Sequence, residues 1–337
     1  MCRYTYIHTY VHTYIGSRLY SPKAGFQHLL NNYVCLCYVL FSNSDYPEVM
    51  QAHRDNRNFV KWNLENTARM LAANYPEKHI LVVKPSRVEY KSFSCYDNFV
   101  PSTNAGVPEH TPTHNALQHL ERLLQGVSER IKSLPINELE ALNPTLSEDI
   151  DIEDLHVSIL LRPSFGPMLS QSRPDLRVMY VCTNSTADKQ SWWERLSLED
   201  SRLALVGFSK GCVVLNQMLY EFHYISTLTP CDTHAMRFID RIDDMSWLDG
   251  GHAGGKNTWI TSRSLLETLS RLKLNIYVHV SPYQVLDEGR PWIGREEKAF
   301  TGMLRKFGAK DRPRQTGQKN CRHGHPFTMI EVQQWDV

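Results

Sequence analysis

Five residues, Gly207-Phe208-Ser209-Lys210-Gly211, have the Gly-x-Ser-x-Gly spacing that places a nucleophilic serine on a sharp strand-to-helix turn. The two glycines allow strand and helix to approach closely, because neither carries a side chain that would clash. The strings LALV before the motif and VVLNQMLYEF after it predict the required strand and helix. We therefore expect Ser209 to be exposed as a nucleophile at the carboxyl edge of a sheet. The alternative is a glycine-rich turn with a capping serine.

The helix expected after Ser209 directs free N–H groups and the positive end of its dipole at the turn. The N–H of Lys210 is thus the expected donor to an oxyanion that forms when the serine attacks a carbonyl carbon. The serine also requires a base, and the base requires an orienting carboxylate. In this type of site they follow the serine in the order Asp or Glu, then His.

Two aspartates are candidates for the orienting carboxylate. Asp287 lies past the predicted strand 274–280, in the loop where this type of site most often keeps its acid, and is preferred. Asp249 ends the predicted strand 245–248 and opens a glycine-dense loop at the same sheet edge as Ser209. Each has a structural alternative: Asp287 as a carboxylate at a helix start, and Asp249 as a turn former.

Three histidines are candidates for the base. His323 and His325 lie beyond the last predicted helix, in CRHGHPF, and His325 is preferred because it precedes an apolar segment. His252 lies in the glycine-dense loop, where a histidine is more often structural or in contact with substrate. A surface position is the alternative for either C-terminal histidine.

The composition excludes several classes of protein. Lys and Arg (37) nearly balance Asp and Glu (36), so no broad positive field is available to bind nucleic acid. The eight cysteines show no CxxC pair and no zinc-type spacing, so no metal site is expected. No cofactor is expected either. The apolar run 33–41 is about half as long as a membrane-spanning helix, so the chain is not expected to be transmembrane. A small-molecule or acyl substrate is the expected partner.

Strand-like runs alternate with helical periodicity, which predicts an α/β fold with a mostly parallel sheet and helices on both faces. Residues 1–32 are interpreted as a low-complexity or targeting tail, and residues 33–337 as a single domain. Residues 135–200 show no steady period and are interpreted as a long irregular insertion, partly disordered. After Gly308 no good strand is expected. The predicted strands are 34–41, 80–84, 203–206, 245–248 and 274–280, and the predicted helices are 63–75, 114–134, 212–222, 263–272 and 293–307.

Four strings carry a specific resemblance to a known family. GFSKGCVVLNQMLYE, SWLDGGHAGGKNTWIT, HVSPYQVLDEGRPWIGREEKAF and SFSCYDNFVPS resemble the chromosome 2 open reading frame 69 family, over about residues 45–100 and 200–307. The resemblance implies a mitochondrial α/β-hydrolase-like protein with a serine-esterase or lipase-type site. Two departures are expected: LFSNSDYPEVM lacks the family's glycine turn after the first strand, and the family's last strand before its histidine is missing.

The sequence leaves two function hypotheses. The first is a mitochondrial serine hydrolase that acts on an ester, thioester or lipid acyl bond. The second is a catalytically inactive protein of the hydrolase fold that serves as a binding or scaffold protein in mitochondrial maintenance, because a fold does not establish a function.

Overall fold

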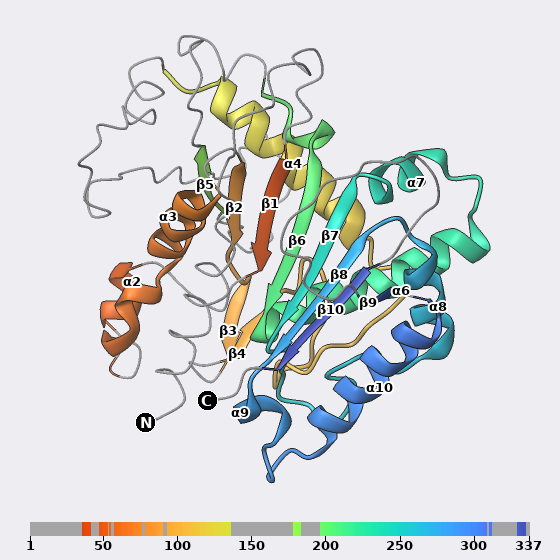
Figure 1. Ribbon diagram of the computed structural model, residues 1–337. Coiled ribbons are helices and arrows are strands. Elements are labelled where there is room, and N and C mark those ends of the chain that lie inside the picture. The colour runs from red at the N-terminus through yellow and green to blue at the C-terminus, as the bar shows by residue number, and fades with distance from the viewer. Residues whose placement is uncertain are drawn as a thin grey trace, which may run out of the picture.

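A central sheet of eight strands, in the order β5-β2-β1-β6-β7-β8-β10-β9, organises the described part of the chain (Figure 1). The computed structural model describes residues 36–41, 47–52, 54, 57–75, 78–89, 93–135, 178–182, 196–308, 310–311 and 329–334. Every neighbouring pair is parallel except β5, which runs antiparallel to β2. The strands are β1 (Leu36–Phe41), β2 (His79–Val83), β5 (Val178–Cys182), β6 (Arg202–Phe208), β7 (Ile242–Leu248), β8 (Asn275–Val280), β9 (Lys310–Asp311) and β10 (Met329–Gln334).

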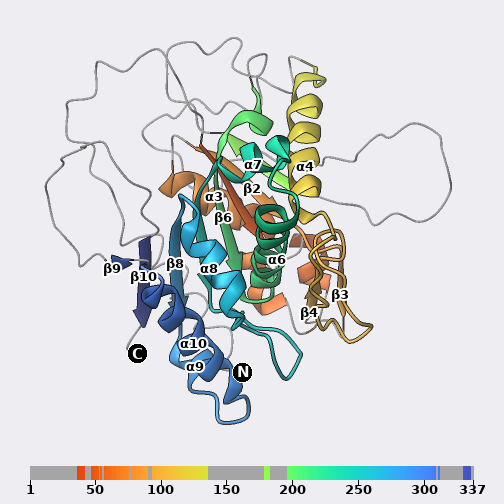
Figure 2. The same ribbon diagram turned by 90° about the vertical axis from the view of Figure 1, so that its right-hand side faces the viewer.

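Helices cover both faces of the sheet (Figures 1 and 2), which confirms the predicted α/β class. Successive side chains of a strand point to opposite faces, so Val39 and Phe41 join one apolar cluster while Leu40 joins the other. The first cluster packs against α4 (Ala116–Lys132), α6 (Cys212–Leu228), α8 (Arg263–Arg271) and α10 (Trp292–Lys306). The second packs against α3 (Leu64–Asn74).

Local sequence explains the start of α3, as predicted. The Asn63 side chain accepts a hydrogen bond from the N–H of Asn66 at 2.8 Å, which satisfies one of the free donors of the first turn. Leu64, Ala68 and Leu71 fall on one face of the helix and are buried against the sheet.

The start of α4 is satisfied differently, through the neighbouring helix α6. Asn115 has a positive φ and makes no side-chain cap. The buried Glu221 carboxylate accepts the N–H groups of Ala116 (2.7 Å) and Leu117 (3.0 Å) instead, together with the amide of Gln217 (2.9 Å). The long helix was predicted from its apolar spacing, but this cap from a residue 105 positions away was not.

Several elements are absent from the prediction. Between the predicted strand 80–84 and the predicted helix 114–134 lies a two-stranded hairpin, β3 (Arg87–Glu89) with β4 (Phe93–Cys95). The predicted irregular insertion supplies edge strand β5 and the short helix η3 (Leu198–Asp200). Further short elements are α2 (Pro47–Ala52), η1 (Arg57–Trp62), η4 (Ser209–Gly211), α7 (Thr233–Ile239) and α9 (Pro282–Val285).

The expectation that no strand follows Gly308 is wrong. β10 (Met329–Gln334) pairs in parallel with β8 over six residues, from Met329 beside Asn275 to Gln334 beside Val280. Its sequence, MIEVQQ, places the β-branched Ile330 and Val332 at alternate positions. This pattern is sufficient for a short strand when β8 provides an adjacent strand for pairing. This strand follows His323 and His325 in the chain, so it is not a strand that precedes a histidine as in the family pattern. Within the described residues, no helix combines the length and apolarity needed to cross a membrane.

Candidate functional site

The candidate site is centred on the Ser209 turn (residues 207–211), which joins the end of β6 directly to η4 and α6. Ser209 has a φ of 51°, in the left-handed region that non-glycine residues seldom adopt. The residue is partly exposed, and none of the described residues forms a hydrogen bond with its hydroxyl. Ser209 thus lies in a strained conformation between strand and helix, with its hydroxyl unoccupied by other groups of the described chain.

Both glycines of the turn are required by close backbone packing. A Cβ atom at Gly207 would lie 2.8 Å from Cα and 2.9 Å from N of Cys212, inside van der Waals contact. A Cβ atom at Gly211 would overlap the carbonyl oxygen of Phe41, the last residue of β1. Side chains at these positions would push α6 away from β6 and β1, so the glycines hold the helix start against two strand ends.

Asp249 lies on the neighbouring strand end, next to Ser209. Phe208 of β6 pairs with Leu248 of β7, so Ser209 and Asp249 are each the first residue after the last paired position of two neighbouring strands. Asp249 also has a positive φ, 52°. The loop that it opens contacts the turn directly, because the N–H of Gly251 lies 3.3 Å from the Ser209 carbonyl oxygen.

The Asp249 carboxylate is held by Ser281, which follows β8. It accepts the Ser281 N–H at 2.8 Å and the Ser281 hydroxyl at 2.7 Å. Burial raises the pKa of Asp249 from 3.8 to about 6, against the lowering effect of these two hydrogen bonds and of Arg290. The carboxylate is therefore oriented by the protein, but its charge is poorly solvated.

Asp287, the preferred acid of the sequence prediction, contacts its own turn between α9 and α10. Its carboxylate accepts the N–H of Gly289 at 2.8 Å and pairs with Nε of Arg290 at 2.8 Å. Arg290 in turn donates to Gln284, whose amide donates to the carbonyls of Asp249 (3.2 Å) and Gly250 (3.3 Å). Asp287 is thus linked to the Ser209 turn through Arg290 and Gln284, whereas Asp249 adjoins it.

His252 is buried, and its hydrogen bonding does not suit a base. Its Nδ1 accepts the N–H of Gly254 at 2.9 Å, which assigns the proton of the neutral ring to Nε2. Burial lowers the pKa of His252, and the positive charge of Lys210 lowers it further, against raising contributions from Asn257 and Glu296. With neither nitrogen free to accept a proton, His252 is arranged as a donor. The other two candidates, His323 and His325, lie outside the described residues.

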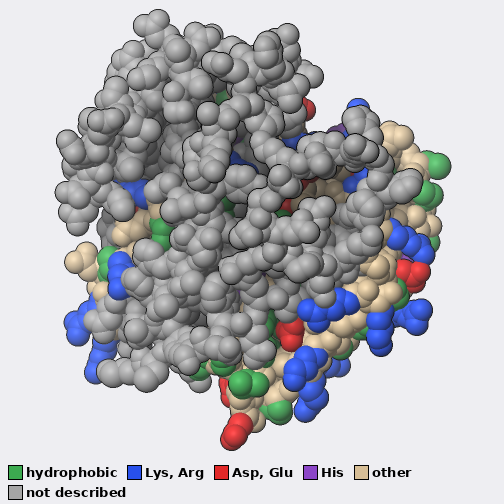
Figure 3. All heavy atoms as spheres, viewed as in Figure 1, with side chains coloured by type: hydrophobic (Ala, Val, Ile, Leu, Met, Phe, Trp, Pro, Cys, Tyr) green, Lys and Arg blue, Asp and Glu red, His purple; other side chains and the backbone are tan. Residues whose placement is uncertain are grey.

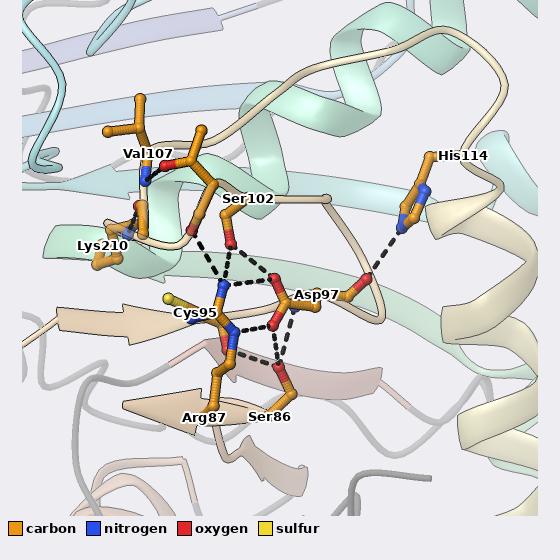
Figure 4. Close-up of polar contacts among 10 residues, drawn as sticks. Ser86, Arg87, Cys95, Asp97, Ser102, Val107, His114 and Lys210 are labelled. Atoms are coloured by element: carbon orange, nitrogen blue, oxygen red, sulfur yellow. Dashed lines mark hydrogen bonds and ion pairs between the residues drawn. The ribbon is translucent and has the colours of Figure 1, made fainter. Parts of the chain in front are cut away.

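The Lys210 side chain is buried and binds a neighbouring loop that contains Gly106. Its ammonium group donates to the Gly106 carbonyl (Figure 4), and burial lowers its pKa. The backbone N–H of Lys210, the predicted oxyanion donor, is in the first turn of η4, where N–H groups have no partner within the helix. Side chain and backbone of this residue therefore have separate roles.

A polar network anchors the same loop, and sequence reasoning missed it. Nε of Arg87 pairs with Asp97 at 2.5 Å, and Asp97 also accepts from the hydroxyls of Ser102 (2.6 Å) and Ser86 (3.3 Å) (Figure 4). Burial favours a higher pKa for Asp97, but these hydrogen bonds outweigh it and lower the pKa. Asp97 and Ser102 lie in the family-like string SFSCYDNFVPS, and no motif marks Arg87 as their partner.

Two other expectations concern metals and the oxyanion loop. None of the described residues forms a group of three or more His, Cys, Asp or Glu side chains suited to a metal ion. Residues 42–46, where the family's glycine turn is replaced, lie outside the described residues. The loss of the second oxyanion donor therefore stays a prediction from the sequence.

Comparison with known proteins identifies the family. The sequence profile of the C2orf69 family matches residues 36–310. The chain is similar to the mitochondrial protein C2orf69 homolog of Mus musculus (38% identity over 80% of this chain and 70% of the relative). It is also similar to the mitochondrial protein C2orf69 of Homo sapiens (36%, 80% and 67%) and to the homolog of Danio rerio (32%, 81% and 66%). No solved structure matches. The chain belongs to the C2orf69 family.

Proposed function

We propose that this mitochondrial protein is a serine hydrolase that cleaves an ester, thioester or lipid acyl bond, with Ser209 as its nucleophile. The observation that carries the proposal is the conformation of Ser209. A non-glycine residue with a φ of 51° connects β6 to α6 and is held there by two glycines that no other residue type can replace without a clash. Strained residues of this kind cluster at functional sites.

The proposed reaction follows from the groups around the serine. The Ser209 hydroxyl oxygen attacks the acyl carbon, its proton passes to a base and then to the leaving alcohol or thiol, and water releases the acyl group. The Lys210 N–H stabilises the oxyanion. We propose Asp249 rather than Asp287 as the acid, because it follows the strand next to Ser209 and its carboxylate is already oriented.

We propose that the base is one of the two C-terminal histidines of the sequence prediction, His323 or His325. Both histidines precede Met329, the first residue of β10, which lies at the strand end opposite to the Ser209 edge.

The second candidate is a non-catalytic binding or scaffold protein of mitochondrial maintenance. One observation favours it: among the described residues, no histidine nitrogen forms a hydrogen bond with Ser209, and His252 is arranged as a donor. In this case the Ser209 turn would shape a binding surface.

A covalent probe separates the two candidates without knowledge of the substrate. A fluorophosphonate should label the wild-type chain at Ser209, because phosphonylation requires an activated serine and N–H donors. Ser209→Ala should abolish labelling, since loss of the nucleophile in a triad enzyme lowers kcat about 10⁶-fold. Ser262→Ala, at an exposed serine, is the matched control. Unlabelled wild-type protein with a cooperative melting transition would support the scaffold candidate instead.

A further inference from the structure

The charged side chains of α10 are sorted between its two faces. The Glu296 carboxylate turns inward and accepts the N–H groups of Asn257 (2.8 Å), Thr258 (2.7 Å) and Trp259 (3.2 Å). Glu297 is buried, and burial raises its pKa. The two acidic side chains of α10 therefore lie away from its solvent-facing side, although the charges of Arg305 and Lys298 still act to lower the pKa of Glu297.

The outer face of α10 carries a stripe of basic residues. Arg295, Lys298 and Arg305 are exposed, and with Gly302 between them their spacing of three, four and three residues places them on one side of the helix. A Cβ atom at Gly302 would meet no atom of the described residues within 4 Å, so there is space for a side chain in the middle of the stripe. Arg295 and Lys298 form no ion pair with any described residue.

The adjacent helix α8 extends this basic surface. Lys273, just after α8, and Lys306, at the end of α10, are exposed and likewise unpaired among the described residues. Figure 3 shows Lys and Arg side chains gathered over the region where Figure 1 draws α8 and α10. The chain as a whole has a net charge of only +1, so the excess of positive charge is local.

Large apolar side chains are exposed beside the N-terminal end of α10. Leu286 is 62% exposed and Tyr283 is 37% exposed, both at α9, six or more residues before α10 begins. An exposed aliphatic and an exposed aromatic residue next to a line of cations is the composition of a surface that inserts shallowly into a membrane interface. Contact with nucleic acid requires the cations but gives no role to Leu286.

We infer that the α9–α10 surface (Tyr283, Leu286, Arg295, Lys298, Arg305 and Lys306) docks this protein on an anionic phospholipid bilayer. The cations contact headgroup phosphates, and Leu286 and Tyr283 enter the boundary between headgroups and acyl chains. The inference rests on the charge and exposure of these elements and is independent of the proposed hydrolase activity. Because Gln284 of α9 contacts the Asp249 loop, docking would also bring the Ser209 edge close to the membrane.

Vesicle co-sedimentation of the full chain tests this inference. Binding is expected to phosphatidylcholine vesicles that contain about 30% cardiolipin or phosphatidylglycerol, and not to pure phosphatidylcholine, and it should weaken with added salt. Each cation near an anionic surface contributes roughly fivefold to affinity, so Arg295→Glu with Lys298→Glu should weaken binding at least about 25-fold. Leu286→Asp should weaken binding separately.

A charge-matched control lies on α4, away from this surface. Arg122→Glu with Arg130→Glu reverses two exposed cations and should leave binding within about twofold of wild type. Equal binding to neutral and anionic vesicles, or an α10 double variant that binds like wild type, would overturn the inference. Preferential binding of duplex DNA at the same ionic strength would assign the stripe to nucleic acid and overturn it as well. Melting curves of each variant establish that the binding change is not due to unfolding.

Discussion

Replacement of Asp249 by Asn is expected to stabilise the protein near neutral pH while it slows any reaction of Ser209. The side chains are nearly isosteric, and Asn tolerates the φ of 52° at this position. An Asn side chain can accept the Ser281 N–H and donate to the Ser281 hydroxyl, so both hydrogen bonds of the carboxylate have a counterpart. The substitution therefore removes mainly the buried charge.

The pKa of Asp249 sets the size of the effect. A rise from 3.8 to about 6 means that the folded state binds the proton more tightly than the unfolded state. The unfolding free energy of the wild type accordingly falls as pH rises from about 4 to 6, and the full cost is present above pH 6. Two pKa units correspond to about 3 kcal/mol, and the partial exposure of the residue reduces this to about 2 kcal/mol.

Urea unfolding of wild type and Asp249→Asn between pH 4 and 8 measures this difference. The variant should be more stable by about 2 kcal/mol at pH 7.5, and the two curves should converge near pH 4. Fluorophosphonate labelling of Ser209 should at the same time slow by up to about 10⁴-fold, the effect of the equivalent change in a serine protease. Asp287→Asn is the control, since its partly exposed ion pair with Arg290 contributes under about 1 kcal/mol. A pH-independent difference would refute the energetic argument, and a larger loss of labelling in Asp287→Asn would move the acid to Asp287.

Three further predictions concern the framework around the site, and each is tested by thermal or urea unfolding. Gly211→Ala should destabilise by about 3 kcal/mol because its Cβ overlaps the Phe41 carbonyl, whereas Gly126→Ala on exposed α4 should stabilise by about 0.5–1 kcal/mol; equal effects would contradict the close packing. Glu221→Gln should cost about 1–2 kcal/mol through the start of α4, and an unchanged midpoint would show that water caps this helix equally well. Burial lowers the pKa of His110 to about 4, so the unfolding free energy falls as the pH drops from 6.5 to 4 and the unfolded state takes up a proton that the folded state does not bind. His110→Gln should make the unfolding free energy less dependent on pH in this range. An unchanged dependence would show that His110 does not contribute to acid destabilisation.

Elements with strong local signals could be predicted from the sequence. The Asn63 cap and the apolar spacing of α3 and α4 depend on neighbours within a few residues, and the structure shows both helices within about two residues of their expected bounds. The strand and helix around Ser209 were predicted because an apolar run and a glycine pair mark them in the sequence itself.

Features that depend on distant partners could not be predicted in this way. β5 and β10 are short strands whose pairing depends on β2 and β8, more than 45 residues away in each case. The same holds at the site: Ser281 and Asp249 have unremarkable neighbours in sequence, and only the register of β7 and β8 brings them together. The choice between Asp249 and Asp287 as the acid therefore depended on the arrangement of the strands in the sheet.

The energetics of the site favour a function for the Ser209 edge that goes beyond packing. Two adjacent strand ends carry non-glycine residues, Ser209 and Asp249, with positive φ, at a cost of roughly 1 kcal/mol or more each. Asp249 adds the cost of a poorly solvated charge, which Asn would remove. A protein that needed this edge only for packing would be more stable with Gly and Asn at these positions. Ser209→Gly should accordingly raise the melting temperature while it abolishes labelling, and a lower melting temperature would show that the serine side chain stabilises the fold.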